Sequence, residues 1–493
     1  MNAPNPISPL TIEAPARVAR LFAAQSAGFQ AAPYPSVDER IVKLKALKKQ
    51  LGRYQDALAG AMNRDFGFRA PAESKMLDLL SAVRTADHTI AHLKRWMKPS
   101  RRSSDLLFAT NSLQVTYQPK GVVGVIAPWN FPLYLAFGPL IAALAAGNRV
   151  MIKMSEITPA TNAMVARMLK EIYSEDEVAV VGEELADPNI FTSLPFNHIV
   201  FTGSPGVGKI VMRTAAQNLT PVTLELGGKS PAIVMRDYPV AAAAKRILHG
   251  KATNCGQICV SPDFALVPRE SVDAFVDAVK ANFVEMFGAQ VGGNHDYTAI
   301  VSEHHFRRIN DLLADARAKG ATITPCIPYD AARDGRQFPI HVVTHCTPDM
   351  RILQEELFGP ILPVLAYDTL DEVVNRVNSG PRPLALYLFS HDVAARDLVL
   401  RHTHSGGVTI NDWGWHVMNH DAPFGGVGNS GMGNYNGLEG FRELSHAKTV
   451  FKRHRFFPID LFYPPYGNLV QRLILKIFLG DPDPSLLSQQ KHD

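Results

Sequence analysis

The sequence is poor in cysteine: its 493 residues contain only Cys255, Cys259, Cys326 and Cys346. Secreted scaffolds held together by disulfides carry more cysteines at more regular spacings, so this kind of protein is excluded. The first ten residues also lack the basic and apolar segments of a secretory signal. We therefore expect a cytoplasmic protein with reduced thiols.

An excess of charge of one sign is also missing. The 50 lysines and arginines nearly balance the 46 aspartates and glutamates, which leaves a formal charge of +4 without any long run of like charges. Such a chain lacks the basic footprint of a nucleic-acid-binding protein. At 46% hydrophobic and 19% charged residues, the composition is that of a globular protein with more than one domain. We expect a small-molecule partner and no nucleic acid.

One stretch is long enough to cross a membrane and free of charge, between Lys120 and Arg149. It contains Pro128, Pro132 and Pro139, which interrupt a single helix. We therefore predict a strand, a turn and a shorter helix in a buried core, and no membrane span.

A second apolar segment, Asn468 to Leu479, is predicted to be a helix. At about 1.5 Å per residue it reaches only about 18 Å, against a hydrocarbon core of about 30 Å. It is too short to span a bilayer. We expect it to pack on the protein's own surface or on a second subunit, with interfacial membrane contact as the alternative.

Strand and helix patterns alternate along most of the chain. A capping box at Ser36 and Glu39 predicts a helix, and a second helix is expected from about 72 to 98. Alternation of this kind predicts an α/β fold with mostly parallel, helix-covered sheets. The predicted strands are 113–117, 122–126, 149–152, 178–181, 198–202, 232–234 and 264–267.

Two segments at strand ends suggest nucleotide binding. Glycines from Gly203 to Gly208 follow the strand 198–202, where backbone N–H groups and a helix N-terminus suit a phosphate. Lys153, Ser155 and Glu156 follow another strand, where a lysine and a carboxylate suit the hydroxyls of a ribose. Taken singly, each segment is more often explained without a ligand, by a ligand-free glycine turn or by a solvated helix cap.

Cys259 is the strongest candidate nucleophile, since it lies in Gly256-Gln257-Ile258-Cys259 after a helical stretch. A reactive cysteine must be accessible and partly thiolate, which loops and helix starts favour. Cys255 is its rival. No further cysteine or histidine stands nearby at zinc-site spacing, so we expect no metal.

Asn130 and Glu225 are polar residues in apolar, turn-like settings. An asparagine amide can donate to a developing oxyanion, and apolar neighbours raise the pKa of a glutamate toward the range of a general base. A turn-stabilising asparagine and an ion-paired glutamate are the alternatives.

Seven motifs occur together in the order found in aldehyde dehydrogenases, so the chain resembles that superfamily from about 40 to 450. The region 428–446 resembles the class 3 branch, and most of all coniferyl aldehyde dehydrogenases. The motifs are Pro128-Trp129-Asn130-Phe131-Pro132, Lys153-Met154-Ser155-Glu156, Phe201-Thr202-Gly203-Ser204, Leu224-Glu225-Leu226-Gly227-Gly228-Lys229, Gly256-Gln257-Ile258-Cys259, Glu355-Glu356-Leu357-Phe358-Gly359-Pro360 and Pro423-Phe424-Gly425-Gly426.

The resemblance implies a role for each matching residue. Cys259 is the nucleophile, Asn130 the oxyanion donor and Glu225 the base that activates water, in an NAD(P)-dependent oxidation through a thiohemiacetal and a thioester. NAD is the expected cofactor, with NADP possible. The residues expected to bind it are Trp129, Lys153, Ser155, Glu156, Gly203, Ser204, Gly208, Leu226, Glu356 and Phe358. One departure is Met154, where the family usually has proline.

The resemblance also implies a Rossmann-type cofactor domain, an α/β catalytic domain and a small strand-based oligomerisation arm in a homodimer. We place the cofactor domain at 1–100 and 121–226, the catalytic domain at 227–444, the arm at 101–120 and 445–454, and a tail at 455–493.

The expected substrate is an aromatic aldehyde such as coniferaldehyde. Trp413, Trp415 and His416 could line an aromatic entrance, although large aromatics are more often core residues. Long-chain fatty aldehydes are the alternative. Transfer of the acyl group to coenzyme A, or a non-catalytic protein with the same fold, is disfavoured because Glu225 accompanies Cys259 and Asn130.

Overall fold

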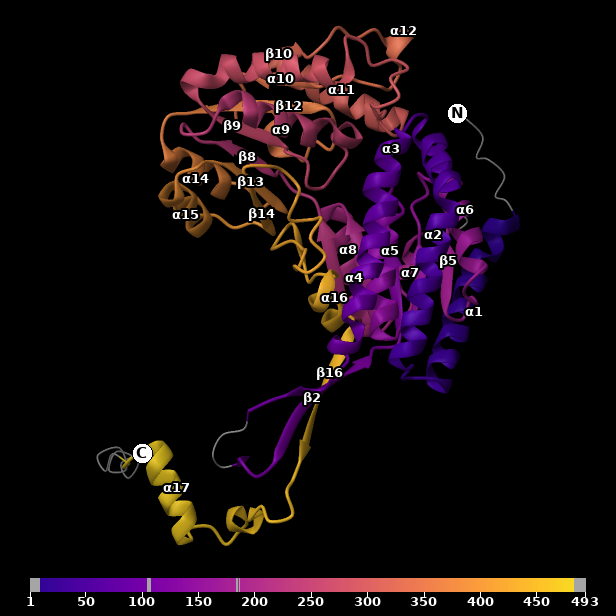
Figure 1. The fold of residues 1–493 in the computed structure, drawn as a ribbon, viewed down its shortest axis with the longest axis vertical. Helices are drawn as coiled ribbons and strands as arrows, with labels where there is room; N and C mark the ends of the chain where they lie inside the picture. Colours follow the sequence, from indigo (N-terminus) through magenta and orange to yellow (C-terminus); the bar gives the residue numbers. More distant parts are fainter. Residues whose placement is uncertain (1–8, 104–107, 183–184, 186, 483–493) are drawn as a thin grey trace, which may run out of the picture. The chain divides into compact units, whose positions relative to one another are not determined.

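The computed structural model describes residues 9–103, 108–182, 185 and 187–482 (Figure 1). The chain divides into two compact units, one of Met1–Met97 with Tyr117–His446 and one of Lys98–Thr116 with Ala447–Asp493. The predicted boundary between cofactor and catalytic domains at residue 226 lies inside the first unit and stays a prediction.

Four strands of a six-stranded sheet form from the segments that the apolar runs predicted. The other two, β7 and β15, were not predicted, and Glu225 lies in β7 rather than in the expected turn-like setting. Its order is β15-β7-β6-β3-β4-β5, parallel except for the short edge strand β15. The register pairs Ile126 with Lys153 and Gly203 with Leu226, so these carboxyl ends lie along one edge. The strands are β3 (Val122–Ile126), β4 (Arg149–Lys153), β5 (Val178–Val181), β6 (His198–Gly203), β7 (Val222–Leu226) and β15 (Gly431–Met432).

The helices around this sheet include the two predicted near the start of the chain. The capping box is confirmed: Ser36 and Glu39 bond each other's backbone N–H groups at the start of α2. The second predicted helix contains a π-helical segment, η1. The helices are α2 (Val37–Phe66), α3 (Pro71–Glu73), η1 (Ser74–Leu79), α4 (Leu80–Trp96), α5 (Tyr134–Ala146), α6 (Pro159–Lys170), α7 (Asn189–Thr192), α8 (Pro205–Ala215) and α16 (Gly437–Glu443).

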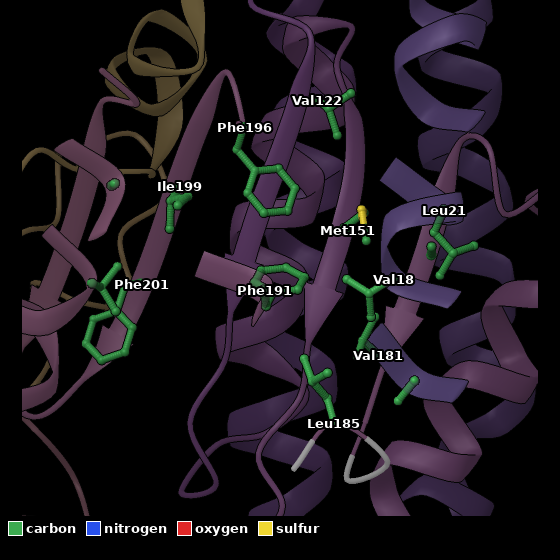
Figure 2. Close-up of a cluster of buried hydrophobic side chains, with 14 of the residues drawn as sticks. Val18, Leu21, Val122, Met151, Val181, Leu185, Phe191, Phe196, Ile199 and Phe201 are labelled. Atoms are coloured by element: carbon green, nitrogen blue, oxygen red, sulfur yellow. The ribbon is translucent and has the colours of Figure 1, made fainter. Parts of the chain in front are cut away.

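The helix α1 (Pro9–Ala31) was not predicted, because prolines obscure its periodicity. It contributes Val18 and Leu21 to an apolar cluster with Met151, Phe191 and others (Figure 2). The buried Gln25 side chain also donates to the Val150 carbonyl at 2.9 Å. Packing against the sheet therefore stabilises α1 more than its own sequence pattern indicates.

The charge-free stretch forms β3, a turn and α5, as predicted. Every residue of α5 is buried. Within the described residues, no helix is long and apolar enough to cross a membrane.

A second sheet of seven strands follows in the first unit, in the order β10-β11-β12-β9-β8-β13-β14, with only β10 antiparallel. Its strands are β8 (Pro231–Val234), β9 (Phe264–Pro268), β10 (Thr322–Pro325), β11 (His341–Thr344), β12 (Ile361–Tyr367), β13 (Ala385–Phe389) and β14 (Gly407–Ile410). The accompanying helices are α9 (Val240–Ala252), α10 (Val272–Phe287), α11 (Glu303–Ala318), α12 (Ala331–Asp334), α13 (Arg351–Gln354), α14 (Leu370–Asn378) and α15 (Val393–His402).

The second unit contains much of a three-stranded sheet of β1 (Ser100–Arg101), β2 (Ser112–Pro119) and β16 (Ser445–Lys452). The predicted apolar helix is α17 (Leu469–Leu479), where the Asn468 side chain caps the N-terminus by accepting from the Gln471 N–H at 2.9 Å. No residue of α17 is buried. What covers this helix stays a prediction, and residues 483–493 of the predicted tail lie outside the described part.

Candidate active site

The loop that carries Cys259 is shaped by three consecutive left-handed residues after α9. Asn254, Cys255 and Gly256 have φ values of 48°, 54° and 73°, and a Cβ at Gly256 would lie 2.4 Å from the Gly359 carbonyl oxygen. Non-glycine residues rarely adopt this conformation unless their surroundings fix it. Cys259 follows on the partly exposed side of the loop.

Cys255 is buried and hydrogen-bonded. Its thiol lies 3.7 Å from the Phe338 carbonyl oxygen and 3.8 Å from the Tyr297 hydroxyl. Of the two neighbouring cysteines, only Cys259 is exposed enough to meet a substrate.

The Gln257 side chain fastens this loop to its surroundings. Its amide donates to the Asn254 and Ala299 carbonyls at 2.9 and 3.1 Å, and its oxygen accepts from the Val301 N–H at 2.9 Å. Buried glutamines are stable when their amides are satisfied in this way. Sequence analysis named Gln257 only as part of a motif and did not predict this role.

Asn130 lies against the same loop. Its side-chain amide donates to the Gln257 carbonyl at 3.1 Å, and its backbone oxygen accepts from the Asn254 amide at 3.1 Å. The residue is only 2% exposed. An amide that is held two residues from Cys259 is suitably placed to donate to an oxyanion there.

A buried ion pair supports Asn130 from behind. Arg69 donates to the Asn130 carbonyl at 2.8 Å and pairs with Asp78 at 2.8 Å, while Asp78 accepts from the Tyr134 N–H at 2.9 Å. Both charged side chains are completely buried. Sequence analysis missed this pair because nothing in the pattern around Arg69 and Asp78 indicates burial.

Glu225 lies on β7, paired in register with Thr202 of β6 and Gly431 of β15. It is 3% exposed, and neither carboxyl oxygen bonds to any described residue. Burial raises the pKa of Glu225 well above its ordinary value. This is the environment that the sequence predicted for a general base.

The Cys259 thiol differs from the sequence expectation of a partly ionised group. Burial, together with the carboxylates of Glu356 and Glu225, raises the pKa of Cys259 to about 12. The resting thiol is therefore protonated. Its dependence on these two carboxylates also indicates that they lie close to it.

Glu356 lies against the turn that follows β7. A Cβ at Gly227 would be 2.1 Å from its Oε2, and the Gly228 N–H bonds to its carboxyl group. Burial and the nearby Asp263 raise the pKa of Glu356 to about 8, and its Oε1 has no partner among the described residues.

Phe358, two residues after Glu356, belongs to a cluster of aromatic rings. Phe358 has a φ of 48°, and its ring lies 5.4 Å from that of Trp129, which also contacts His305 at 4.8 Å. A left-handed phenylalanine is an uncommon conformation that often marks a functional site.

At the other end of the sheet edge, Lys153 donates to the Met154 carbonyl at 2.7 Å and lies 3.8 Å from the Glu156 carboxylate. The Glu156 side chain is 72% exposed. The Ser155 hydroxyl accepts from the Ile157 N–H at 3.3 Å. Because α6 begins only at Pro159, these residues form a turn rather than a helix cap.

The glycine-rich turn opens α8 as predicted. Gly203 ends β6, and the Ser204 hydroxyl caps the helix by accepting from the Val207 N–H. Leu226 packs directly over Gly208. These features fit a dinucleotide phosphate: a helix N-terminus follows a turn of small residues. The Thr202 hydroxyl is also buried there and has no partner among the described residues.

The pattern of the aldehyde dehydrogenase family matches residues 7–450. The chain belongs to this family. The predicted α/β fold and the predicted resemblance are therefore confirmed, and this aldehyde dehydrogenase is an oxidoreductase.

Relatives and solved structures agree with this membership. A probable coniferyl aldehyde dehydrogenase of Pseudomonas aeruginosa is 49% identical over 93% of this chain and 96% of the relative. A coniferyl aldehyde dehydrogenase of Pseudomonas sp. HR199 is 40% identical, covering 89% and 92%. Substrate-bound AldH of Staphylococcus aureus has a TM-score of 0.88 at 34% identity, covering 94% and 99%. Betaine aldehyde dehydrogenase from the same organism, in complex with NAD+, has a TM-score of 0.79 at 28% identity, covering 88% and 87%.

Proposed function

We propose that this enzyme oxidises aromatic aldehydes, of the coniferaldehyde type, to carboxylic acids with NAD. The observation that carries the proposal is an accessible Cys259 beside a buried Glu225 whose carboxyl group bonds to no described residue, on a loop to which Asn130 is bonded. The names of two Pseudomonas relatives support the aromatic substrate.

Cys259 and Asn130 perform the first step. The sulfur attacks the aldehyde carbon and forms a C–S bond while the thiol proton leaves to solvent. The carbonyl oxygen becomes an oxyanion, which the Asn130 amide and the Cys259 N–H stabilise by donating to it. Covalent capture is needed because the aldehyde carbon gives up hydride readily only when it is tetrahedral.

Glu225 performs the last step. Its carboxylate takes a proton from water, the hydroxide attacks the thioester carbon, and the C–S bond breaks to give the acid and free Cys259. Because burial raises the pKa of Glu225, this base becomes available only as the pH rises. A general base that activates water favours hydrolysis of the thioester over transfer of the acyl group to coenzyme A.

NAD, when bound, supplies the hydride acceptor. Lys153 and Glu156, with Ser155 nearby, would hold the adenosine ribose, and Gly203, Ser204 and Gly208 would face the pyrophosphate. Glu356, Phe358, Trp129 and Leu226 would surround the nicotinamide end. A Glu156 carboxylate repels a 2′-phosphate, so NAD is preferred to NADP.

The same proposal includes a cytoplasmic homodimer with the β1, β2 and β16 sheet in its contact. Four unpaired cysteines suit a reducing compartment. For the arm, the two domains and the tail, we propose the residue ranges predicted from the sequence.

A steady-state panel tests the proposal: aromatic and aliphatic aldehydes, each with NAD and NADP, followed by the absorbance of the reduced cofactor. We expect the highest kcat/KM for phenylpropenals with NAD. Higher values for long-chain aldehydes would favour a fatty aldehyde dehydrogenase instead, and acyl-coenzyme A as the product would overturn hydrolysis.

A further inference from the structure

A cavity of about 610 Å³ opens between α4 and the segment that follows β14. Its lining contains the exposed Trp415 indole, Met418, and the basic and imidazole side chains of Arg84, His88 and His420. Asn419 and the carboxylates of Asp87 and Asp421 complete it. Of the three residues predicted to line an aromatic entrance, Trp413, Trp415 and His416, only Trp415 lines this cavity. Trp413 instead bonds His249 at 2.8 Å, and His416 bonds the Thr409 hydroxyl at 2.7 Å.

His420 has a defined tautomer because of Thr85. The Thr85 hydroxyl bonds the Ser81 carbonyl at 2.8 Å and also bonds the Tyr134 hydroxyl. Because a carbonyl can only accept, we assign the single Thr85 proton to the bond with Ser81. His420 Nδ1 lies 3.2 Å from the same hydroxyl and must therefore donate to it. The other ring nitrogen, Nε2, then carries a lone pair and can only accept.

This acceptor is buried and has no partner among the described residues. His420 is 6% exposed. Burial, together with the nearby Arg84 and His88, lowers the pKa of His420 to about 4, so the imidazole is neutral at physiological pH. An unpaired buried acceptor costs stability unless a donor meets it.

Hydrogen bonds through the buried interior lead from His420 and Thr85 to Tyr134. The Tyr134 hydroxyl bonds the Thr85 side chain, and the Glu225 carboxylate adds to the effect of burial in raising the pKa of Tyr134. Burial is the main cause that raises the pKa of Tyr435, and the nearby Glu225 and Cys259 also raise it. Thr85 and Tyr134 thus connect His420 to the part of the interior that lies near Glu225.

We propose that His420 determines substrate specificity by accepting a hydrogen bond from a phenolic hydroxyl at the far end of the aldehyde. This inference rests on the proposed function and assigns a residue to the recognition of the phenolic hydroxyl that coniferaldehyde carries. A phenol supplies the one neutral donor that the Nε2 lone pair requires, and its ring suits the Trp415 indole. A fatty aldehyde would leave the Nε2 acceptor unpaired, and a site built to bond a substrate hydroxyl rejects substrates that lack one.

The test compares three aldehydes that differ at one position: 4-hydroxycinnamaldehyde, cinnamaldehyde and 4-methoxycinnamaldehyde, with NAD at a pH that keeps the phenol protonated. The wild type should prefer the hydroxylated compound by about tenfold in kcat/KM over both others. His420→Phe should bring the ratio to about 1 while cinnamaldehyde turnover changes little. His420→Gln, which restores an acceptor oxygen, should recover part of the preference.

His88→Phe is the matched control, since His88 lies on the same wall but faces Asp421 at 3.3 Å. It should keep the preference. If His420→Phe fails to fold, Thr85→Val, which removes the fixed tautomer, should lower the preference instead. Equal rates for all three compounds in the wild type would overturn the role of His420 and leave the proposed function intact. No turnover of any cinnamaldehyde would overturn the aromatic substrate itself.

Discussion

The two ends of the candidate site are built differently. Around Cys259, the important side chains are buried, and Glu225 and Glu356 carry carboxyl oxygens without partners among the described residues. At the proposed ribose end, the Glu156 side chain is 72% exposed and lies near Lys153. The first region shields reacting groups from water, and the second leaves a flexible carboxylate in solvent.

This difference predicts how strongly each region responds to mutation. When a buried catalytic group is removed, water cannot take over its role, because electrostatic interactions are strongest where water is excluded. An exposed carboxylate competes with solvent, and its contribution is small. Substitutions should therefore have large effects near Cys259 and small effects near Glu156.

The largest effect is expected for Cys259→Ala. Loss of the nucleophile should reduce kcat by at least about 10⁴-fold while nucleotide binding persists, since covalent capture is no longer available. Steady-state rates and cofactor titration by fluorescence measure the two properties. Cys255→Ala is the matched control and should keep most activity. Equal losses in both folded variants would contradict the assignment of Cys259.

Glu225→Gln should come next, with a loss in kcat of about 10² to 10⁴-fold. It keeps the shape of the side chain but removes the base, so one turnover should occur before the thioester stalls. Rapid mixing should show a burst near one equivalent of reduced cofactor, and mass spectrometry should find an acyl group on the Cys259 peptide.

The pH profile provides the control for Glu225. In the wild type, thioester hydrolysis should accelerate with rising pH, because burial raises the pKa of Glu225 and only the deprotonated form is a base. The variant should lose this dependence. An unchanged steady-state rate would contradict the general-base role, and the absence of any burst would mean that Glu225 acts earlier.

Asp78→Ala tests the buried support of the same region. It leaves Arg69 charged and unpaired in the interior, which should lower the free energy of unfolding by about 3–5 kcal/mol. Urea denaturation measures this change. The exposed pair of Lys75 and Asp56 is the control, and Asp56→Ala should have little effect. Similar losses in both variants would contradict the contrast between buried and exposed charges.

The sequence predicted the strands of the parallel sheet well, because short apolar runs bounded by turns have one stable arrangement there. The segments 122–126 and 178–181 match β3 and β5 residue for residue. It also predicted α17, whose N-cap asparagine and apolar run are local features.

Other features depend on contacts between distant residues and were not predictable. The helix α1 is stabilised by packing against the sheet, which its proline-interrupted sequence pattern does not indicate. The Arg69–Asp78 pair can support the site only because the fold brings Arg69 to the Asn130 carbonyl. Thr85 and His420 are 335 positions apart, so no local pattern reveals the tautomer of that histidine. The raised pKa of Glu225 was predicted from its apolar neighbours. The raised pKa of Cys259 was not, because burial in the fold protonates a thiol that its loop position predicted to be partly ionised.

The smallest effect is expected at the exposed end, for Glu156→Gln. A carboxylate that accepts from the ribose 2′-hydroxyl repels a 2′-phosphate, so its loss should raise kcat/KM for NADP relative to NAD by about three- to tenfold. The effect is modest because a side chain that is 72% exposed can swing away, and salt screens its charge. Measuring both cofactors at low and high salt separates charge from shape: the NAD preference of the wild type should shrink with salt, and that of the variant should not. A wild type that already uses NADP as well as NAD would mean that Glu156 does not face the ribose. A loss of a hundredfold or more in NAD use by the variant would show that this exposed end is as demanding as the buried one.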